Sequence, residues 1–60
     1  MTIEVYENTY NADGQREQKF VNVYYKVDKI EKGFESCFLT TEENEVIHID
    51  LSGHELRITY

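Results

Sequence analysis

Apolar residues recur at every second position through most of the chain, and this alternation constrains the fold more than any other feature. A period of two is typical of β-strands with one buried face, whereas an amphipathic helix repeats every three to four residues. The alternation runs through five segments, at about residues 2–10, 16–30, 34–41, 45–51 and 54–60. The sequence therefore predicts an all-β protein, a five-stranded antiparallel meander without a helix.

Short loop sequences between these segments predict which strand residues lie opposite one another. Residues 12–14 (Ala-Asp-Gly), 31–33 (Glu-Lys-Gly) and 42–44 (Glu-Glu-Asn) each end in a residue that tolerates a positive φ, as a three-residue hairpin loop requires. Residues 52–53 (Ser-Gly) fit a two-residue hairpin. These loops place the apolar residues on one face of the sheet, because paired residues share a face. The predicted pairs are Val5 with Val21, Val27 with Cys37, Leu39 with Ile47 and Ile49 with Leu56.

The chain is short enough that only one unit is expected. It has 60 residues with no proline, repeat or linker-like stretch, so residues 1–60 are expected to form a single small β domain. A sheet of this size cannot leave its whole apolar face in water. Two architectures would cover that face: a small barrel in which the first and last strands approach each other, or a face-to-face sandwich of two copies. The sequence leaves both open.

Several features predict a protein of the cytoplasm. No apolar run approaches the roughly 20 residues that a membrane span needs, and the first residues lack the basic start and apolar stretch of a signal peptide. The single cysteine, Cys37, permits no internal disulfide. Cys37 also falls on the apolar face, so we expect it to be buried and to act as a small hydrophobic residue and not as a nucleophile.

Acidic side chains dominate, with twelve Asp and Glu against six Lys and Arg, and a net charge of -6. The imbalance is concentrated in residues 34–60, which carry six acidic and one basic side chain. This charge argues against unaided binding to nucleic acid. Glu42, Glu43 and Glu45 gather at the tip of a predicted hairpin. Such a cluster usually keeps a hairpin tip solvated, and it could also bind a basic site on another protein.

Aromatic residues collect on the face opposite the predicted core. The members proposed to bind a partner are Tyr6, Phe20, Tyr24 and Phe38. They could simply stabilise the sheet through cross-strand pairs. Alternatively, they could form a contact surface, because aromatic residues dominate protein interaction hot spots and also stack on single-stranded nucleic acid. The negative charge favours a protein over nucleic acid as the partner.

Signals for catalysis are weak throughout the chain. Glycines are isolated and each is explained by a turn, so no phosphate-binding loop is predicted. His48 and Asp50 share one strand face, and the predicted register places Asp50 opposite Glu55. These three side chains are a weak candidate for a divalent metal site, because the spacing lacks a Cys/His framework. We expect no catalytic residue, no cofactor and no enzymatic activity.

The function favoured by these observations is that of a non-enzymatic, acidic protein-binding module that forms a homodimer. Its small size and its many residues with A/T-rich codons suggest a phage or mobile-element product of a bacterium that modulates a host protein. The alternative is a small β-barrel that binds single-stranded nucleic acid through its aromatic face.

Overall fold

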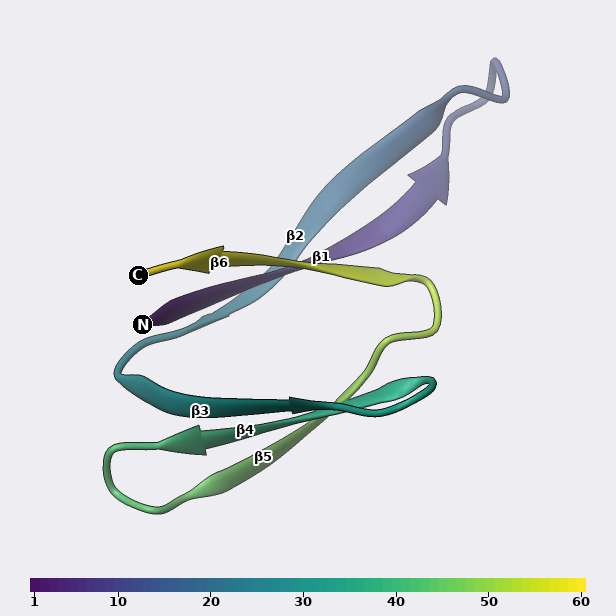
Figure 1. The fold of residues 1–60 in the computed structure, drawn as a ribbon. Helices are drawn as coiled ribbons and strands as arrows, with labels where there is room; N and C mark the ends of the chain where they lie inside the picture. Colours follow the sequence, from purple (N-terminus) through teal and green to yellow (C-terminus); the bar gives the residue numbers. More distant parts are fainter.

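The computed structural model describes all 60 residues and is entirely β, with antiparallel strands (Figure 1). The chain forms no helix, and so none that could cross a membrane. Its six strands are β1 (Thr2–Tyr10), β2 (Arg16–Tyr24), β3 (Val27–Lys32), β4 (Ser36–Thr41), β5 (Val46–Asp50) and β6 (His54–Thr59). They form two three-stranded sheets, which we call the terminal sheet (β2-β1-β6) and the middle sheet (β3-β4-β5). The predicted all-β antiparallel class is confirmed, but the predicted five strands of a single sheet are wrong.

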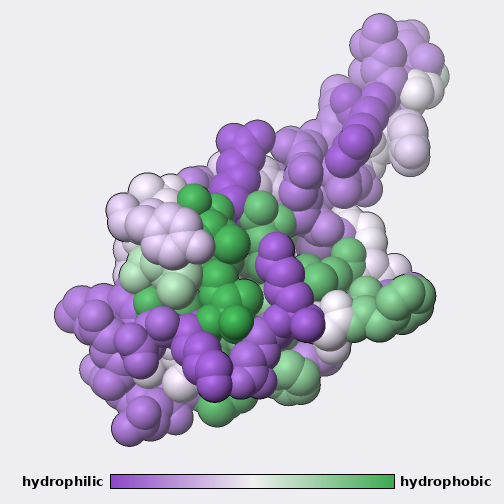
Figure 2. All heavy atoms as spheres, in the orientation of Figure 1, coloured by the Kyte–Doolittle hydropathy of each residue, from purple (hydrophilic) through white to green (hydrophobic).

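The core lies between the two sheets, where their apolar faces meet. Six residues are buried: Ile3, Val5, Val27, Cys37, Leu39 and Ile49. The first two come from the terminal sheet and the other four from the middle sheet, and β6 adds the half-buried Leu56 and Ile58. Figure 2 shows hydrophobic side chains gathered in the region where the sheets face each other. Because the two sheets of one chain cover each other, this face does not require a second copy to cover it.

A corner at Tyr25 and Lys26 divides the predicted strand 16–30 into β2 and β3. Lys26 has a φ of 54°, a left-handed conformation that is costly for a residue with a side chain. The corner is held by the Glu42 amide, which donates a hydrogen bond to the Lys26 carbonyl at 3.0 Å. It turns the chain from the terminal sheet into the middle sheet. No glycine, proline, asparagine or aspartate marks the corner, which explains why the sequence did not reveal it.

The β1–β2 register is predicted correctly near the loop and wrongly beyond it. The predicted loop at residues 12–14 implies that Tyr6 lies opposite Phe20, and it does, but the register shifts by one residue between Val5 and Tyr6. Val5 therefore lies opposite Asn22 and not opposite Val21. A β-bulge of this kind inserts one extra residue into one strand, and the inserted residue here is Val21.

The bulge exchanges the faces of the last β2 residues. Tyr24, predicted on the outer face, lies opposite Ile3 and packs against the core. Val21 is 48% exposed. Because side chains alternate between faces, one inserted residue moves every later side chain of the strand to the other face.

The β4–β5 hairpin agrees with the prediction. Leu39 lies opposite Ile47 and Cys37 opposite Ile49. Asn44, the last loop residue, has a φ of 63°. Its amide donates to the Thr41 carbonyl at 3.0 Å, which closes the three-residue loop.

The β3–β4 hairpin is predicted wrongly. Val27 lies opposite Thr41 and not opposite Cys37, which lies opposite Lys32. The Gly33 amide donates to the Ser36 carbonyl at 2.8 Å, so the loop consists of residues 34–35 and not 31–33. Gly33 does not adopt a positive φ, and the loop geometry assumed for it is therefore absent.

The predicted hairpin at residues 52–53 is also wrong, because the chain passes there from the middle sheet to the terminal sheet. Strand β6 pairs with β1, which sets Leu56 opposite Val5 and not opposite Ile49. Gly53 has a φ of 72°, and its carbonyl accepts a hydrogen bond from the Asn8 amide at 2.8 Å. The first and last strands are thus neighbours.

The distal part of the β1–β2 hairpin, residues 7–20, projects beyond the core (Figure 1), and we call it the hairpin arm. The molecule measures 43 × 21 × 15 Å. The loop at residues 12–14 is predicted correctly: Gly14 has a φ of 76°, and the Asn11 amide donates to the Gln15 carbonyl at 2.9 Å. All residues from 12 to 22 are exposed. The arm is therefore stabilised by backbone pairing and surface contacts and not by packing in the core.

Candidate interaction surfaces

The β4–β5 turn presents three exposed carboxylates, those of Glu42, Glu43 and Glu45, on a fixed backbone. The Thr41 hydroxyl accepts hydrogen bonds from the Glu43 amide at 3.3 Å and from the Glu45 amide at 3.2 Å. The Thr41 amide donates to the Glu45 carbonyl at 2.9 Å. A threonine side chain that bonds to nearby amides in this way stabilises a turn. The positions of the acidic residues are therefore set before any partner binds.

An open hollow of about 170 Å³ lies between this turn and the Tyr25–Lys26 corner. We call it the acidic hollow, and it is lined by Tyr25, Lys26, Thr41, Glu42, Glu43 and Glu45. Tyr25 is 67% exposed, so its ring is available to a ligand. None of the three carboxylates forms an ion pair within the chain. The hollow thus combines an excess of negative charge with an aromatic ring.

An arginine or lysine side chain from another protein would suit this hollow. A guanidinium group pairs well with carboxylates and also stacks on the face of an aromatic ring. The Lys26 ammonium reduces the negative charge without cancelling it. Since the site is open to water, salt would screen the attraction.

The four aromatic residues predicted to bind a partner do not form one surface. Tyr6 and Phe20 contact each other edge to face, with ring centroids 6.0 Å apart, on the outer face of the terminal sheet. Phe38 packs against His48, with centroids 4.9 Å apart, on the outer face of the middle sheet. Tyr24 packs against the core. The two outer faces point in opposite directions because the core lies between them.

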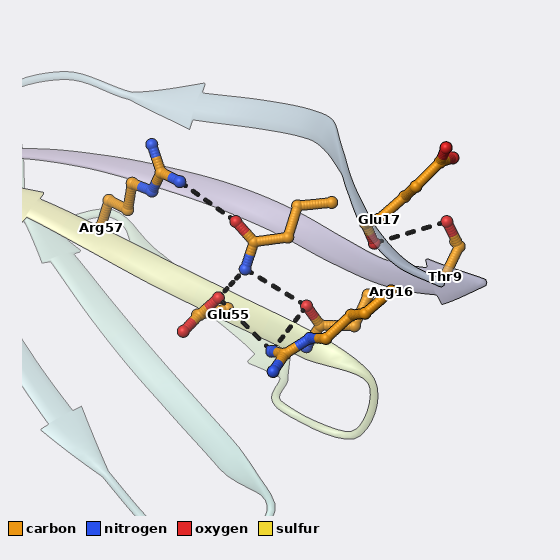
Figure 3. A network of polar contacts seen from close by, with 7 residues as sticks. Thr9, Arg16, Glu17, Glu55 and Arg57 are labelled. Carbon is orange, nitrogen blue, oxygen red and sulfur yellow. Dashed lines mark hydrogen bonds and ion pairs between the residues drawn. The ribbon is translucent and has the colours of Figure 1, made fainter. Parts of the chain in front are cut away.

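A polar network covers the outer face of the terminal sheet (Figure 3). Gln18 of β2 is its centre: its side-chain nitrogen donates to Glu55 and, at 3.3 Å, to Asn8. Arg57 donates to the Gln18 side-chain oxygen at 3.1 Å, and Arg16 lies 3.8 Å from the Glu55 carboxylate. The network therefore joins β2 to β6 across β1.

Arg57 also covers Tyr6, with its guanidinium carbon 4.5 Å from the ring centroid. The Tyr6 hydroxyl donates to the Glu4 carboxylate at 2.8 Å. This hydrogen bond raises the pKa of Tyr6 above its ordinary value, because the bonded proton is harder to remove. One ring face and the hydroxyl group of Tyr6 are thus engaged within the chain.

The residues considered for a metal site are not brought together. Asp50 lies opposite Ser36 in the middle sheet, whereas Glu55 lies opposite Tyr6 in the terminal sheet. The structure contains no group of three His, Cys, Asp or Glu side chains placed to hold a metal ion. The predicted pairing of Asp50 with Glu55 fails because β5 and β6 belong to different sheets.

Cys37 is fully buried beside Ile49, as predicted. Burial raises the pKa of the Cys37 thiol, because a thiolate would lose its hydration, and the nearby Lys32 ammonium opposes this effect only in part. A thiol in this environment is a poor nucleophile.

Sequence reasoning missed Tyr25 and Lys26 as parts of the acidic hollow, because the alternation placed Tyr25 on the core face. Neither residue is of a type that favours a turn, so no local signal in the sequence marks them.

A comparison of the chain with protein families, with curated proteins and with solved structures gives no match.

Proposed function

We propose that the protein is a non-enzymatic protein-binding module, and that its acidic hollow receives a basic side chain of a protein partner. The observation that carries this proposal is the fixed acidic turn beside Tyr25, in which three carboxylates have no ion pair within the chain. A binding group held in place before association loses less conformational entropy when it binds.

The energetics of such a site favour moderate affinity and fast association. Exposed ion pairs contribute about 0–1 kcal/mol each, and an aromatic ring that stacks on a cation adds about 0.5–1 kcal/mol. Charge complementarity acts mainly on the association rate and on partner choice. We therefore expect binding to weaken as the salt concentration rises.

Two features support binding over catalysis. The hollow is open to water and lacks the enclosure that substrate binding usually requires. The only cysteine lies inside the core and not in the hollow. Such a module would suit a phage or mobile-element product that binds a basic site of a host protein. This origin stays a prediction.

The aromatic residues support a protein partner over single-stranded nucleic acid. Tyr6 is covered by Arg57 and Tyr24 by the core, which leaves Phe20 and Phe38 exposed on opposite sides. Nucleic acid binding by stacking needs successive rings along one basic groove.

The test is an NMR titration of the protein with a short arginine-rich peptide. We expect amide shifts at residues 25–26 and 41–45, and their loss in a triple variant with Glu42→Gln, Glu43→Gln and Glu45→Gln. A matched control changes the charge equally elsewhere, through Asp13→Asn, Glu31→Gln and Glu35→Gln. Equal weakening in both variants would overturn the proposal, because binding would then depend on net charge alone. Titration with oligo-dT at low salt should leave the spectrum unchanged, and shifts around Phe20 would instead support nucleic acid as the ligand.

A further inference from the structure

Strand β2 forms one edge of the terminal sheet, and its outer side pairs with no other strand. Asn11 and Gln15 form a hydrogen-bonded pair at the end of the arm. Hydrogen-bonded and non-hydrogen-bonded pairs alternate along an antiparallel ladder, so Glu17 and Lys19 also turn their backbone groups toward β1. The backbone groups of Arg16, Gln18 and Phe20 therefore point away from β1, toward the free edge of the sheet.

We propose that two copies of the chain associate by pairing their β2 edges antiparallel, around a two-fold axis at Gln18. This arrangement sets Arg16 of each copy opposite Phe20 of the other, so that outward-pointing backbone groups meet and can form hydrogen bonds. The two terminal sheets become one continuous sheet, in the order β6-β1-β2-β2-β1-β6. The inference goes beyond the binding role of the acidic hollow and does not depend on it.

Charge selects this register among those that a two-fold axis permits. With the axis at Gln18, Glu17 of each copy lies opposite Lys19 of the other, which gives two opposite-charge pairs per dimer. An axis at Glu17 would set the two Glu17 carboxylates opposite each other. An axis at Lys19 would set the two Lys19 ammonium groups opposite each other. Like charges directly opposite each other destabilise a sheet, so both shifted registers are unfavourable.

The surroundings of β2 leave this edge accessible. The hairpin arm projects from the core, so a second copy can approach it without meeting the middle sheet (Figure 1). The Arg16 side chain leans across the sheet toward Glu55 of β6 (Figure 3), away from the free edge. The Gln18 side chain bonds to Glu55 and Arg57 of β6, so it lies in the same direction. The bulge at Val21 interrupts the regular strand, so the regular part of the free edge consists of residues 16–20.

The local charge of this segment also suits self-association. Residues 16–20 carry two basic and one acidic side chain, although the whole chain has a net charge of -6. The two copies thus meet at a part of the chain that is not acidic, which limits the repulsion between them. Five residues from each copy make a small interface, so we expect a dimer that forms as the concentration rises and not a permanent one.

Sedimentation equilibrium over a range of concentrations tests the proposal with two charge reversals, Glu17→Lys and Lys19→Glu. Each variant alone sets two like-charge pairs in its dimer, so we expect its association constant to fall roughly tenfold. In an equimolar mixture of the two variants, every contact between unlike copies joins a lysine to a glutamate. Mixing should therefore restore dimers to the wild-type level.

Two further variants separate this interface from others. Glu35→Lys makes the same charge change at an exposed turn and should leave the dimer intact. Phe20→Glu should also retain the dimer, because the new carboxylate would lie opposite Arg16 of the other copy. Wild-type protein that stays monomeric up to millimolar concentration would overturn the proposal. A mixture that fails to restore association, or loss of the dimer with Phe20→Glu, would overturn it as well.

Discussion

Strands β4 and β2 have similar alternating sequences and opposite environments. In β4, Cys37 and Leu39 are fully buried, and Phe38 between them faces solvent. In β2, Val21 and Val23 lie on either side of Asn22 in the same way, yet no residue of the strand is buried. The difference is that the terminal sheet lies over β4, whereas the bulge turns Val23 to the outer face and no element lies over most of the rest of β2. Alternation therefore indicates a strand, and burial depends on what packs against it.

The largest expected effect is loss of stability on truncating the core of β4. Leu39→Ala should lower the free energy of unfolding by roughly 2–5 kcal/mol, because it removes buried contacts and leaves a cavity. Phe20→Ala, on the exposed β2, should lower it by about 1 kcal/mol or less, since only the edge contact with Tyr6 is lost. Urea unfolding followed by circular dichroism measures both.

A domain of this size has little stability to lose, and Leu39→Ala could unfold it completely. Ile49→Val is the milder variant of the same core and should cost about 0.5–1.5 kcal/mol. If Phe20→Ala cost about 2 kcal/mol or more, as truncation of a buried side chain does, the contrast between the two strands would be refuted.

A smaller effect concerns the Cys37 thiol. Because burial raises its pKa, the folded chain holds this proton more tightly than the unfolded chain. The resulting contribution to stability is complete below about pH 8.5, where an unfolded cysteine is protonated, and it is lost as the pH rises further. The unfolding free energy of wild type should thus fall more steeply above that pH than that of Cys37→Ala.

The same residue gives a second measurement. Native protein should react slowly with an aromatic disulfide reagent, and the rate should rise when urea unfolds the chain. Rapid reaction without urea would mean that β4 opens as readily as the hairpin arm.

The smallest effect is expected at the corner between the sheets. Lys26→Gly should raise the free energy of unfolding by about 0.5–1 kcal/mol, because glycine adopts a positive φ without steric cost. Lys29→Gly, three residues later in β3, should instead lower it by about 0.5–1 kcal/mol, because glycine weakens a strand and the exposed ion pair with Glu31 is also lost. Equal changes of the same sign would show that the corner is not strained.

Turn chemistry explains which parts of the fold the sequence could predict. Gly14 and Asn44 occupy loop positions with positive φ, and both of their loops are correct. Gly33 does not adopt a positive φ, and its hairpin is predicted wrongly. Gly53 does adopt one, but the turn there joins the two sheets and not two paired strands, so a positive φ alone does not identify the partner strand. The corner at Lys26 and the bulge at Val21 have no local sequence signal, because they follow from packing one sheet on the other.

The candidate site, too, could be predicted only in part from the sequence. Glu42, Glu43 and Glu45 are recognisable as one acidic cluster because they belong to one short loop. Tyr25 and Lys26 complete the hollow from a distant part of the chain, and only the tertiary fold brings them there. A surface assembled from two loops depends on the unpredicted corner, so sequence reasoning could supply only half of it.

The bulge at Val21 separates parts of the molecule that need not unfold together. On its core side, β1 and β2 contribute Ile3, Val5 and Tyr24 to the packed interior. On its outer side, the backbone hydrogen bonds of the arm are shielded by no buried residue. Amide hydrogens of the arm are therefore expected to exchange with solvent through local fraying, whereas those of β4 exchange only through global unfolding. The arm can open and close many times within the lifetime of one folded molecule.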